Sequence, residues 1–159
     1  MLELNHADKW ASQPEVGAIL QAAGVTARVV DAPECRLVSG DLAAFSRVSG
    51  VDLSSALRLA RDRTLVLGGT ELASGWHAEG FALSDLSAGL ALVDLSGTGL
   101  ANLVAKATTA DSGPSKAITF AGIPVVLDLK GETLGLHIER GLLAYLWTWL
   151  AVALQESST

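Results

Sequence analysis

Apolar and polar residues alternate along two neighbouring segments late in the chain, residues 123–129 and 133–139. Successive side chains of a strand point to opposite faces, so this period of two predicts two strands, each with one face in the core. Lys130-Gly131-Glu132 predicts a turn between them. The first strand is expected to point Ile123, Val125, Leu127 and Leu129 one way, and Pro124, Val126 and Asp128 the other. The second is expected to point Leu134, Leu136 and Ile138 inward, and Thr133, His137 and Glu139 outward.

Helical spacing of apolar residues predicts helices elsewhere. One is predicted over residues 14–23, where Pro14 suits the first turn and Gly24 the left-handed stop. A second begins at Leu42. Thr98 is expected to cap a third, whose apolar positions are Leu100, Leu103, Val104 and Ala107.

Further strands are predicted over residues 25–30, 35–38, 64–67, 89–95 and 117–120, while residues 51–63 are ambiguous. The order strand, Ser-Gly, helix occurs at Ser39-Gly40 and again at Ser96-Gly97, a weak internal repeat. Hairpins dominate the second half, which favours an α+β fold of mainly antiparallel sheets with helices packed on one face. Two strand-helix-strand halves are expected.

The domain organisation follows from the absence of a Pro-, Ser- or Gly-rich linker. We expect one domain over residues 1–159, with approximate halves at 14–80 and 81–155 and a frayed tail at 156–159.

The last predicted helix, residues 140–154, is apolar on every side. Trp147 and Trp149 lie about 200° apart on a helical wheel, so they do not share one core face. A helix of this kind must be covered twice. We expect it to contact a partner, with Arg140, Tyr145, Trp147 and Trp149 as the interface residues; the alternative is that other parts of the chain cover its second face.

Composition limits the classes of partner. The chain has 159 residues, 18% of them charged, a net charge of −6 and one cysteine. Such an acidic chain is not expected to bind nucleic acid or an anionic membrane surface. A lone cysteine forms neither an internal disulfide nor a Cys-rich zinc site. The start of the chain lacks the apolar run of a signal peptide, and the longest apolar stretch is shorter than the about twenty residues of a membrane span, so a cytoplasmic protein is expected.

Candidate catalytic groups are few. The three histidines lack metal-ligand spacing, so no metal site and no catalytic residue are predicted. Trp76 and His77 lie in a glycine-bounded segment and are candidates for a ligand pocket, although an exposed loop explains them more simply. His137 and Glu139 share an outward face, either as an acid/base pair or as solvent-exposed residues. Three clustered arginines suggest an anion clamp or, more simply, a solvated helix face: Arg58, Arg61 and Arg63.

Several motifs of the second half occur in the order and spacing of a known family. They are Asp85-Leu86-Ser87, Leu95-Ser96-Gly97-Thr98, the helix from Leu100 to Lys106, and an Arg, Leu, Trp, Trp, Leu pattern at Arg140, Leu146, Trp147, Trp149 and Leu150. With them, the chain resembles the gamma subunit of heterotetrameric sarcosine oxidase, and through it the folate-binding fold of the glycine-cleavage aminomethyltransferase (T-protein) family. Thr64 to Gly68 extends the resemblance into the first half.

The resemblance implies a non-catalytic, structural subunit without cofactors of its own. The complex oxidatively demethylates sarcosine to glycine and passes the one-carbon unit to tetrahydrofolate. FAD, FMN, NAD and tetrahydrofolate would belong to the larger alpha and beta subunits, the expected partners; alone, the chain could form a homo-oligomer. The alternative function is a stand-alone binding protein for a folate-like small ligand, with Trp76 and His77 in its pocket. An independent aminomethyl-transferring enzyme is disfavoured, because no convincing Asp/Glu pair is present.

Overall fold

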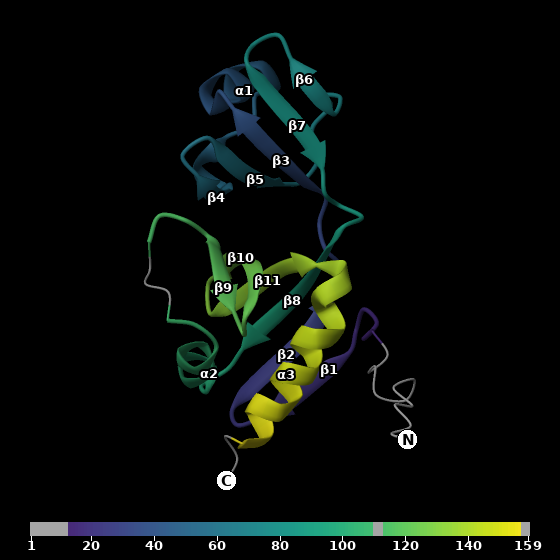
Figure 1. The fold of residues 1–159 in the computed structure, drawn as a ribbon, viewed down its shortest axis with the longest axis vertical. Coiled ribbons are helices and arrows are strands. Elements are labelled where there is room, and N and C mark those ends of the chain that lie inside the picture. Colours follow the sequence, from purple (N-terminus) through teal and green to yellow (C-terminus); the bar gives the residue numbers. More distant parts are fainter. Residues whose placement is uncertain (1–12, 110–112, 157–159) are drawn as a thin grey trace, which may run out of the picture.

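Two antiparallel sheets lie one above the other along the long axis of the molecule (Figure 1). The structure is a computed structural model that describes residues 13–109 and 113–156. We call the part built on the larger sheet the six-stranded lobe (residues 18–30 and 90–156) and the other the five-stranded lobe (residues 35–85).

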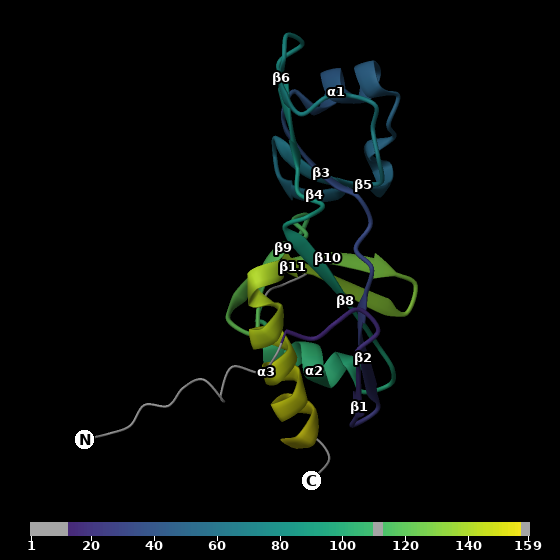
Figure 2. The ribbon, with the colours of Figure 1, turned by 90° about the vertical axis from the view of Figure 1, so that its right-hand side faces the viewer.

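The six-stranded lobe contains the larger core. Its strands, in spatial order, are β1 (Ile19–Ala22), β2 (Val25–Val30), β8 (Leu90–Ser96), β11 (Thr133–Glu139), β10 (Ile123–Lys130) and β9 (Ala117–Phe120). Its helices are α2 (Leu100–Ala107), the short η2 (Arg140–Leu142) and α3 (Leu143–Glu156). Both α2 and α3 pack against one face of the sheet (Figure 2), because their buried residues join a single apolar cluster with the strands.

The five-stranded lobe is smaller and carries one α-helix. Its strands, in spatial order, are β4 (Leu57–Ala60), β5 (Arg63–Leu67), β3 (Cys35–Gly40), β7 (Phe81–Asp85) and β6 (Gly75–His77). Its helices are α1 (Leu42–Ser49) and the short η1 (Leu53–Ser55). Asp41 caps α1 by accepting a hydrogen bond from the Ala44 backbone at 2.9 Å. Phe45 then packs edge-on against Phe81 and closes one face of the sheet.

The predicted α+β class is confirmed, with antiparallel sheets and helices on one face of each. The halves are divided differently from the prediction, because β1 and β2 join the sheet that the second half builds. The five-stranded lobe is therefore an insertion between β2 and β8, and the boundary at residue 80 does not separate the two sheets.

The helix predicted over residues 14–23 is wrong, since residues 19–22 form strand β1. Ala23 and Gly24 both have positive φ, 51° and 72°, and turn the chain into a hairpin with β2. Leu20 and Ala22 pack on the six-stranded core from this strand. Tertiary pairing thus overrides a spacing that suits a helix equally well.

Two smaller predictions about helices are also corrected. Helix α2 starts at Leu100 with Gly99 at its N-cap and no side-chain capping bond, so Thr98 does not cap it. Residues 51–63 form η1, β4, a turn and the first residue of β5, so the three clustered arginines do not lie on a helix face. His6 lies outside the described residues, as does the tail from residue 157. No helix within the described residues has the length and apolarity needed to cross a membrane.

Candidate functional site

The junction between the lobes is the place where residues far apart in sequence converge. The chain passes from one lobe to the other twice, over residues 31–35 and 86–89, and we call these segments the chain crossings. They are tied together, because the Cys35 backbone donates to Ser87 Oγ at 3.0 Å and the Leu86 backbone donates to the Cys35 carbonyl at 2.9 Å. A second connection joins the lobes without a chain crossing. There, Ser115 Oγ donates to the Leu59 carbonyl at 2.8 Å, and the Lys116 backbone donates to the Arg58 carbonyl at 2.7 Å.

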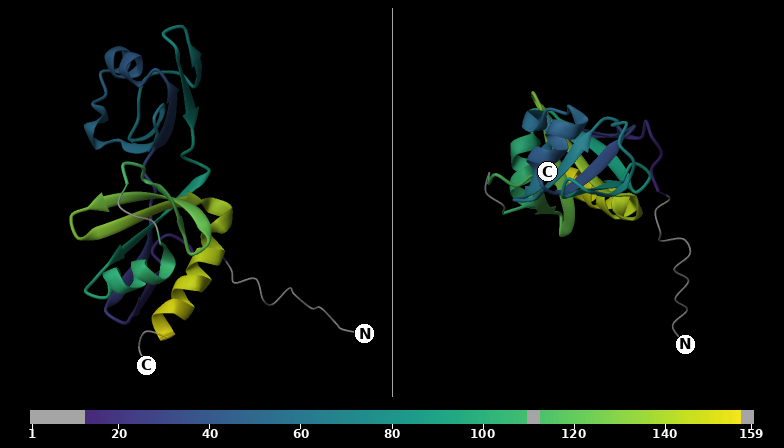
Figure 3. Two further views of the ribbon diagram at one scale, coloured as in Figure 1. Left: turned by 60° about the vertical axis from the view of Figure 1, so that its left-hand side comes forward. Right: turned by 90° about the horizontal axis from the view of Figure 1, so that it is seen from above.

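His137 lies inside this junction, and the prediction that it faces solvent is wrong. Its side chain is 0% exposed. The β10–β11 hairpin lies between the helices of its own lobe and the five-stranded lobe, so both faces of β11 are covered (Figure 3). A small apolar cluster that includes Cys35 and Val126 closes the outer face. Sequence alternation identifies the two faces of β11 but not what covers each of them.

The charged neighbour of His137 is Asp128, which had not been singled out as a site residue. Asp128 Oδ2 lies 3.6 Å from His137 Nε2 and 2.8 Å from Lys130 Nζ. The pairing with Glu139 that the sequence suggested does not form among the described residues, because neither ring nitrogen of His137 has a hydrogen-bond partner and its one carboxylate neighbour within 4 Å is Asp128. An acid in the middle of an apolar strand was the available signal for Asp128. The strand register is unbroken to Lys130, so the expected alternation holds, and at this end of β10 the face with Asp128 is the buried one: Asp128 is 7% and Leu129 63% exposed.

Burial controls the ionisation of these groups. It lowers the pKa of His137, and the nearby Asp128 carboxylate only partly offsets this, so the imidazole is neutral near pH 7. Neither ring nitrogen has a hydrogen-bond partner among the described residues. Burial also raises the pKa of the Cys35 thiol, with Asp85 adding to the effect. A protonated thiol is a poor nucleophile, which favours a packing role for Cys35.

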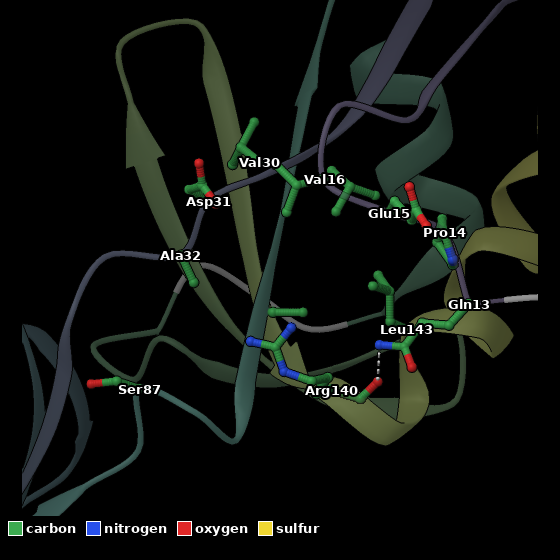
Figure 4. A pocket seen from close by; sticks show the side chains of 12 residues that line it. Gln13, Pro14, Glu15, Val16, Val30, Asp31, Ala32, Ser87, Arg140 and Leu143 are labelled. Carbon is green, nitrogen blue, oxygen red and sulfur yellow. Dashed lines mark hydrogen bonds between the residues drawn. The ribbon is translucent and has the colours of Figure 1, made fainter.

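A cavity of about 400 Å³ lies beside the chain crossings and contains Arg140 (Figure 4). The guanidinium donates to the Ala88 carbonyl at 3.0 Å and to the Leu90 carbonyl at 2.8 Å. These bonds fasten the start of η2 to the segment that leads into β8. Glu15 and Asp31 supply two carboxylates to the cavity wall. Arg140, predicted as an interface residue, therefore has an intramolecular contact that its sequence position does not reveal.

Helix α3 uses much of its apolar surface within the molecule. Leu146 and Leu150 are 0% exposed. Trp147 and Trp149 are half-buried against the six-stranded core, and Trp149 packs edge-on against Phe120 with ring centroids 5.9 Å apart. The helix is thus covered on more than one side by the chain itself, and the role of the two tryptophans at an interface stays a prediction.

The outward face of α3 contains Tyr145 and Val152, 50% and 51% exposed. The Tyr145 hydroxyl donates to the Ala121 carbonyl at 2.9 Å, which holds its ring in place. Val152, which had not been chosen as an interface residue, is exposed over the same face of the helix. Its position seven residues after Tyr145 was the available signal.

Trp76 and His77 lie on the edge strand β6 and point to opposite faces of the sheet. His77 Nε2 lies 2.9 Å from the Ala73 carbonyl, and its ring stacks on Phe81 at 4.6 Å between centroids. Trp76 is 73% exposed. The structure does not bring these two side chains together in one pocket.

No group of three or more His, Cys, Asp or Glu residues within residues 13–109 and 113–156 is arranged to hold a metal ion.

The comparisons with known proteins identify a fold. No family model and no curated protein matches the chain. Its α+β arrangement of two antiparallel sheets is, however, shared by a chain of an oxidase complex of known structure. That structure is the heterotetrameric sarcosine oxidase from Corynebacterium sp. U-96 in complex with pyrrole 2-carboxylate. This chain is 23% identical in sequence to the matching chain, and the two superpose with a TM-score of 0.64.

The match extends over nearly the whole of both chains, 97% of this one and 95% of the other. The resemblance inferred from the motifs is therefore confirmed at the level of the fold. It includes the five-stranded lobe, for which the motifs were sparse.

Proposed function

We propose that this chain is a gamma-subunit-like, non-catalytic component of a heterotetrameric sarcosine oxidase. The observation that carries the proposal is the end-to-end fold match with a chain of such a complex. In the proposed assembly, the larger alpha and beta subunits oxidise sarcosine to glycine and pass the one-carbon unit to tetrahydrofolate. FAD, FMN, NAD and tetrahydrofolate are assigned to those subunits, and the complex to the cytoplasm.

The proposed contribution of this chain is mechanical. Exposed apolar side chains on a folded surface favour association, because burying them against a partner removes them from water. Helix α3 offers Tyr145 and Val152 on its outward face, beside the half-buried Trp149. This face is the proposed contact that the sequence pattern at Arg140, Tyr145, Trp147 and Trp149 first indicated.

Co-expression with the large subunits of a sarcosine oxidase from the same source tests the proposal. A tagged wild-type chain is expected to co-elute with both large subunits at a fixed stoichiometry, measured by size-exclusion chromatography with light scattering. The large subunits are expected to lose sarcosine oxidation faster on warming when this chain is omitted. A chain that stays monomeric and never co-elutes contradicts the proposal.

Two matched variants on α3 locate the contact. Val152→Asp places a charge on the exposed apolar face, and we expect it to weaken co-elution by about tenfold or more. Gln155→Asp adds the same charge one turn further along, at a position that is already polar and exposed, and is expected to change co-elution less than about twofold. Equal effects of the two variants would place the contact elsewhere on the chain.

A further inference from the structure

The most exposed aromatic residue among the described residues lies far from α3. Trp76 is 73% exposed on β6, the outermost strand of the five-stranded sheet. Exposing a large indole to water is unfavourable, and tryptophan is one of the residue types that most often anchors protein interfaces. The neighbours of Trp76 therefore decide what kind of surface surrounds it.

Strand register places Trp76 at one end of a row that crosses four strands. Trp76 on β6 pairs with Ala82 on β7, Ala82 pairs with Ser39 on β3, and Ser39 pairs with Arg63 on β5. Directly opposite residues share a face of an antiparallel sheet. Two small side chains thus lie between a tryptophan and an arginine whose backbones are about 14 Å apart, at about 4.8 Å per strand. We call these four residues the Trp76–Arg63 row.

This row lies on the face of the sheet that α1 does not cover. The face under α1 carries Val38, Phe81 and Leu83, which alternate with the residues of the row. Figures 1 and 2 show α1 on one side of the five-stranded sheet and no helix on the other.

The six-stranded lobe covers only the lower part of that second face. Cys35 and Leu65, close to the junction, are 0% and 1% exposed. Ser39 and Ala82, which pair further from the junction, are half-buried. Ser84 lies in the same cross-strand row as Leu65, on β7, and is exposed. The face that begins as an interlobe contact therefore continues as an open surface ending at Trp76.

The charge on this surface is locally positive. Arg63 is exposed and makes no ion pair with any residue of the described chain, and Arg61 lies two residues before it in the β4–β5 turn. Asp62, between them, is the acid in this turn; its carbonyl accepts a hydrogen bond from the Gly40 backbone. With a net charge of −6 for the whole chain, an unpaired arginine beside an apolar surface favours a carboxylate-bearing partner.

We propose that the Trp76–Arg63 row is a second subunit contact, which binds a segment of a large subunit that presents an apolar side chain to Trp76 and a carboxylate to Arg63. The inference rests on the proposed function and adds a surface on the lobe that does not contain α3. The apolar side chain covers Ala82 and Ser39, because these small residues leave the row open between its ends. The carboxylate forms the ion pair that Arg63 lacks within the chain.

Binding of the purified large subunits to immobilised chain tests this proposal. Trp76→Ala is expected to raise the dissociation constant by about tenfold or more, as truncation of an interface anchor does. Val48→Ala is the matched control, because Val48 is 44% exposed on α1, which packs on the opposite face of the same sheet. It is expected to change the constant by less than about twofold. Unchanged circular dichroism and urea midpoints confirm that both variants fold.

Arg63→Glu separates the charged part of the contact from the apolar part. This reversal is expected to weaken binding by about three- to tenfold at low salt and by less at high salt, because screening weakens exposed ion pairs. Trp76→Ala is expected to weaken binding to the same extent at both salt concentrations. If Arg63→Glu instead leaves binding unchanged at low salt, the carboxylate assignment is overturned.

The possible outcomes distinguish this inference from the proposed function. If the wild-type chain binds the large subunits and Trp76→Ala binds as tightly, the inference is overturned and the proposed function stands. If the wild-type chain does not bind them, both are overturned. If the free chain forms a dimer that Trp76→Ala abolishes, the occupant of the row is a second copy of this chain and the subunit contact proposed here is overturned.

Discussion

The two lobes close their sheets to different extents. In the six-stranded lobe, α2 and α3 together cover one face, and a single large cluster joins them to the strands. In the five-stranded lobe, α1 covers one face with a small cluster, and the other face splits between an interlobe contact and the open Trp76–Arg63 row. Most of the buried apolar residues, which underlie the mean hydropathy of +0.40, therefore lie in the six-stranded lobe, whereas Trp76, the most exposed aromatic residue of the described part of the chain, lies on the other.

The largest expected effect concerns whether the two cores unfold together. Phe45→Ala removes a side chain that is 0% exposed from the five-stranded lobe, and we expect a loss of about 3–5 kcal/mol in its unfolding free energy. Amide hydrogen exchange should then lose protection in β3 and β7 but keep it in β8 and β11. An equal loss in all four strands would show that residues 1–159 form one cooperative domain.

The converse substitution tests the six-stranded core. Leu150→Ala empties a position that is 0% exposed on α3 and is expected to cost about 2–5 kcal/mol, measured by urea unfolding. Val152→Ala, two residues later and 51% exposed, is expected to cost less than about 0.5 kcal/mol. Similar costs for the two variants would mean that α3 is not packed as described.

The junction between the lobes makes stability depend on pH. Burial holds the pKa of His137 below its ordinary value of about 6.5, so the unfolded chain binds a proton more readily than the folded chain. The contribution of His137 is therefore fully present above about pH 6.5 and is lost as pH falls towards the folded-state pKa, by at most about 1.4 kcal/mol per pH unit. The charged groups that act on His137 are Asp128, Lys130 and Asp94.

Urea unfolding at several pH values between 5 and 8 measures this dependence. His137→Gln should flatten the dependence of the unfolding free energy on pH below about pH 6.5. A wild-type slope that survives in His137→Gln would assign the titration to another group.

The smallest expected effect concerns the connection that joins the lobes without a chain crossing. Ser115→Ala removes the hydrogen bond from Ser115 Oγ to the Leu59 carbonyl and is expected to cost about 0.5–1.5 kcal/mol. Ser55→Ala, at an exposed position of η1, serves as control and is expected to change stability by less than about 0.5 kcal/mol. Faster exchange at β4 in Ser115→Ala alone would confirm that this bond holds the lobes together.

Sequence patterns predicted β10 and β11 closely because each has a clear period of two, and β9 covers the predicted residues 117–120. Strands β6 and β7 were missed. The patterns failed at residues 19–22, where strand and helix both satisfy the spacing and pairing with β2 decides. They could not show that the five-stranded lobe is inserted between β2 and β8, because strand pairing over such distances leaves no local signal.

The candidate site was predicted less well than the fold. Alternation placed His137 and Leu134 on opposite faces of β11, but whether solvent or another lobe covers a face depends on tertiary packing. Trp76 was recognised as unusual, yet its assignment to a pocket with His77 assumed a loop where the structure has a strand. Arg140 and Tyr145 were recognised from an apolar helix and a family pattern, and neither signal reveals their internal hydrogen bonds.

Hydrogen–deuterium exchange of the chain, free and bound to the large subunits, tests most directly the claim that the exposed surfaces of both lobes serve assembly. If that claim holds, binding slows exchange at β6 and the adjoining β7 and along α3, and leaves α2 unchanged. Exchange that is identical in β6 and α3 with and without the large subunits would contradict it.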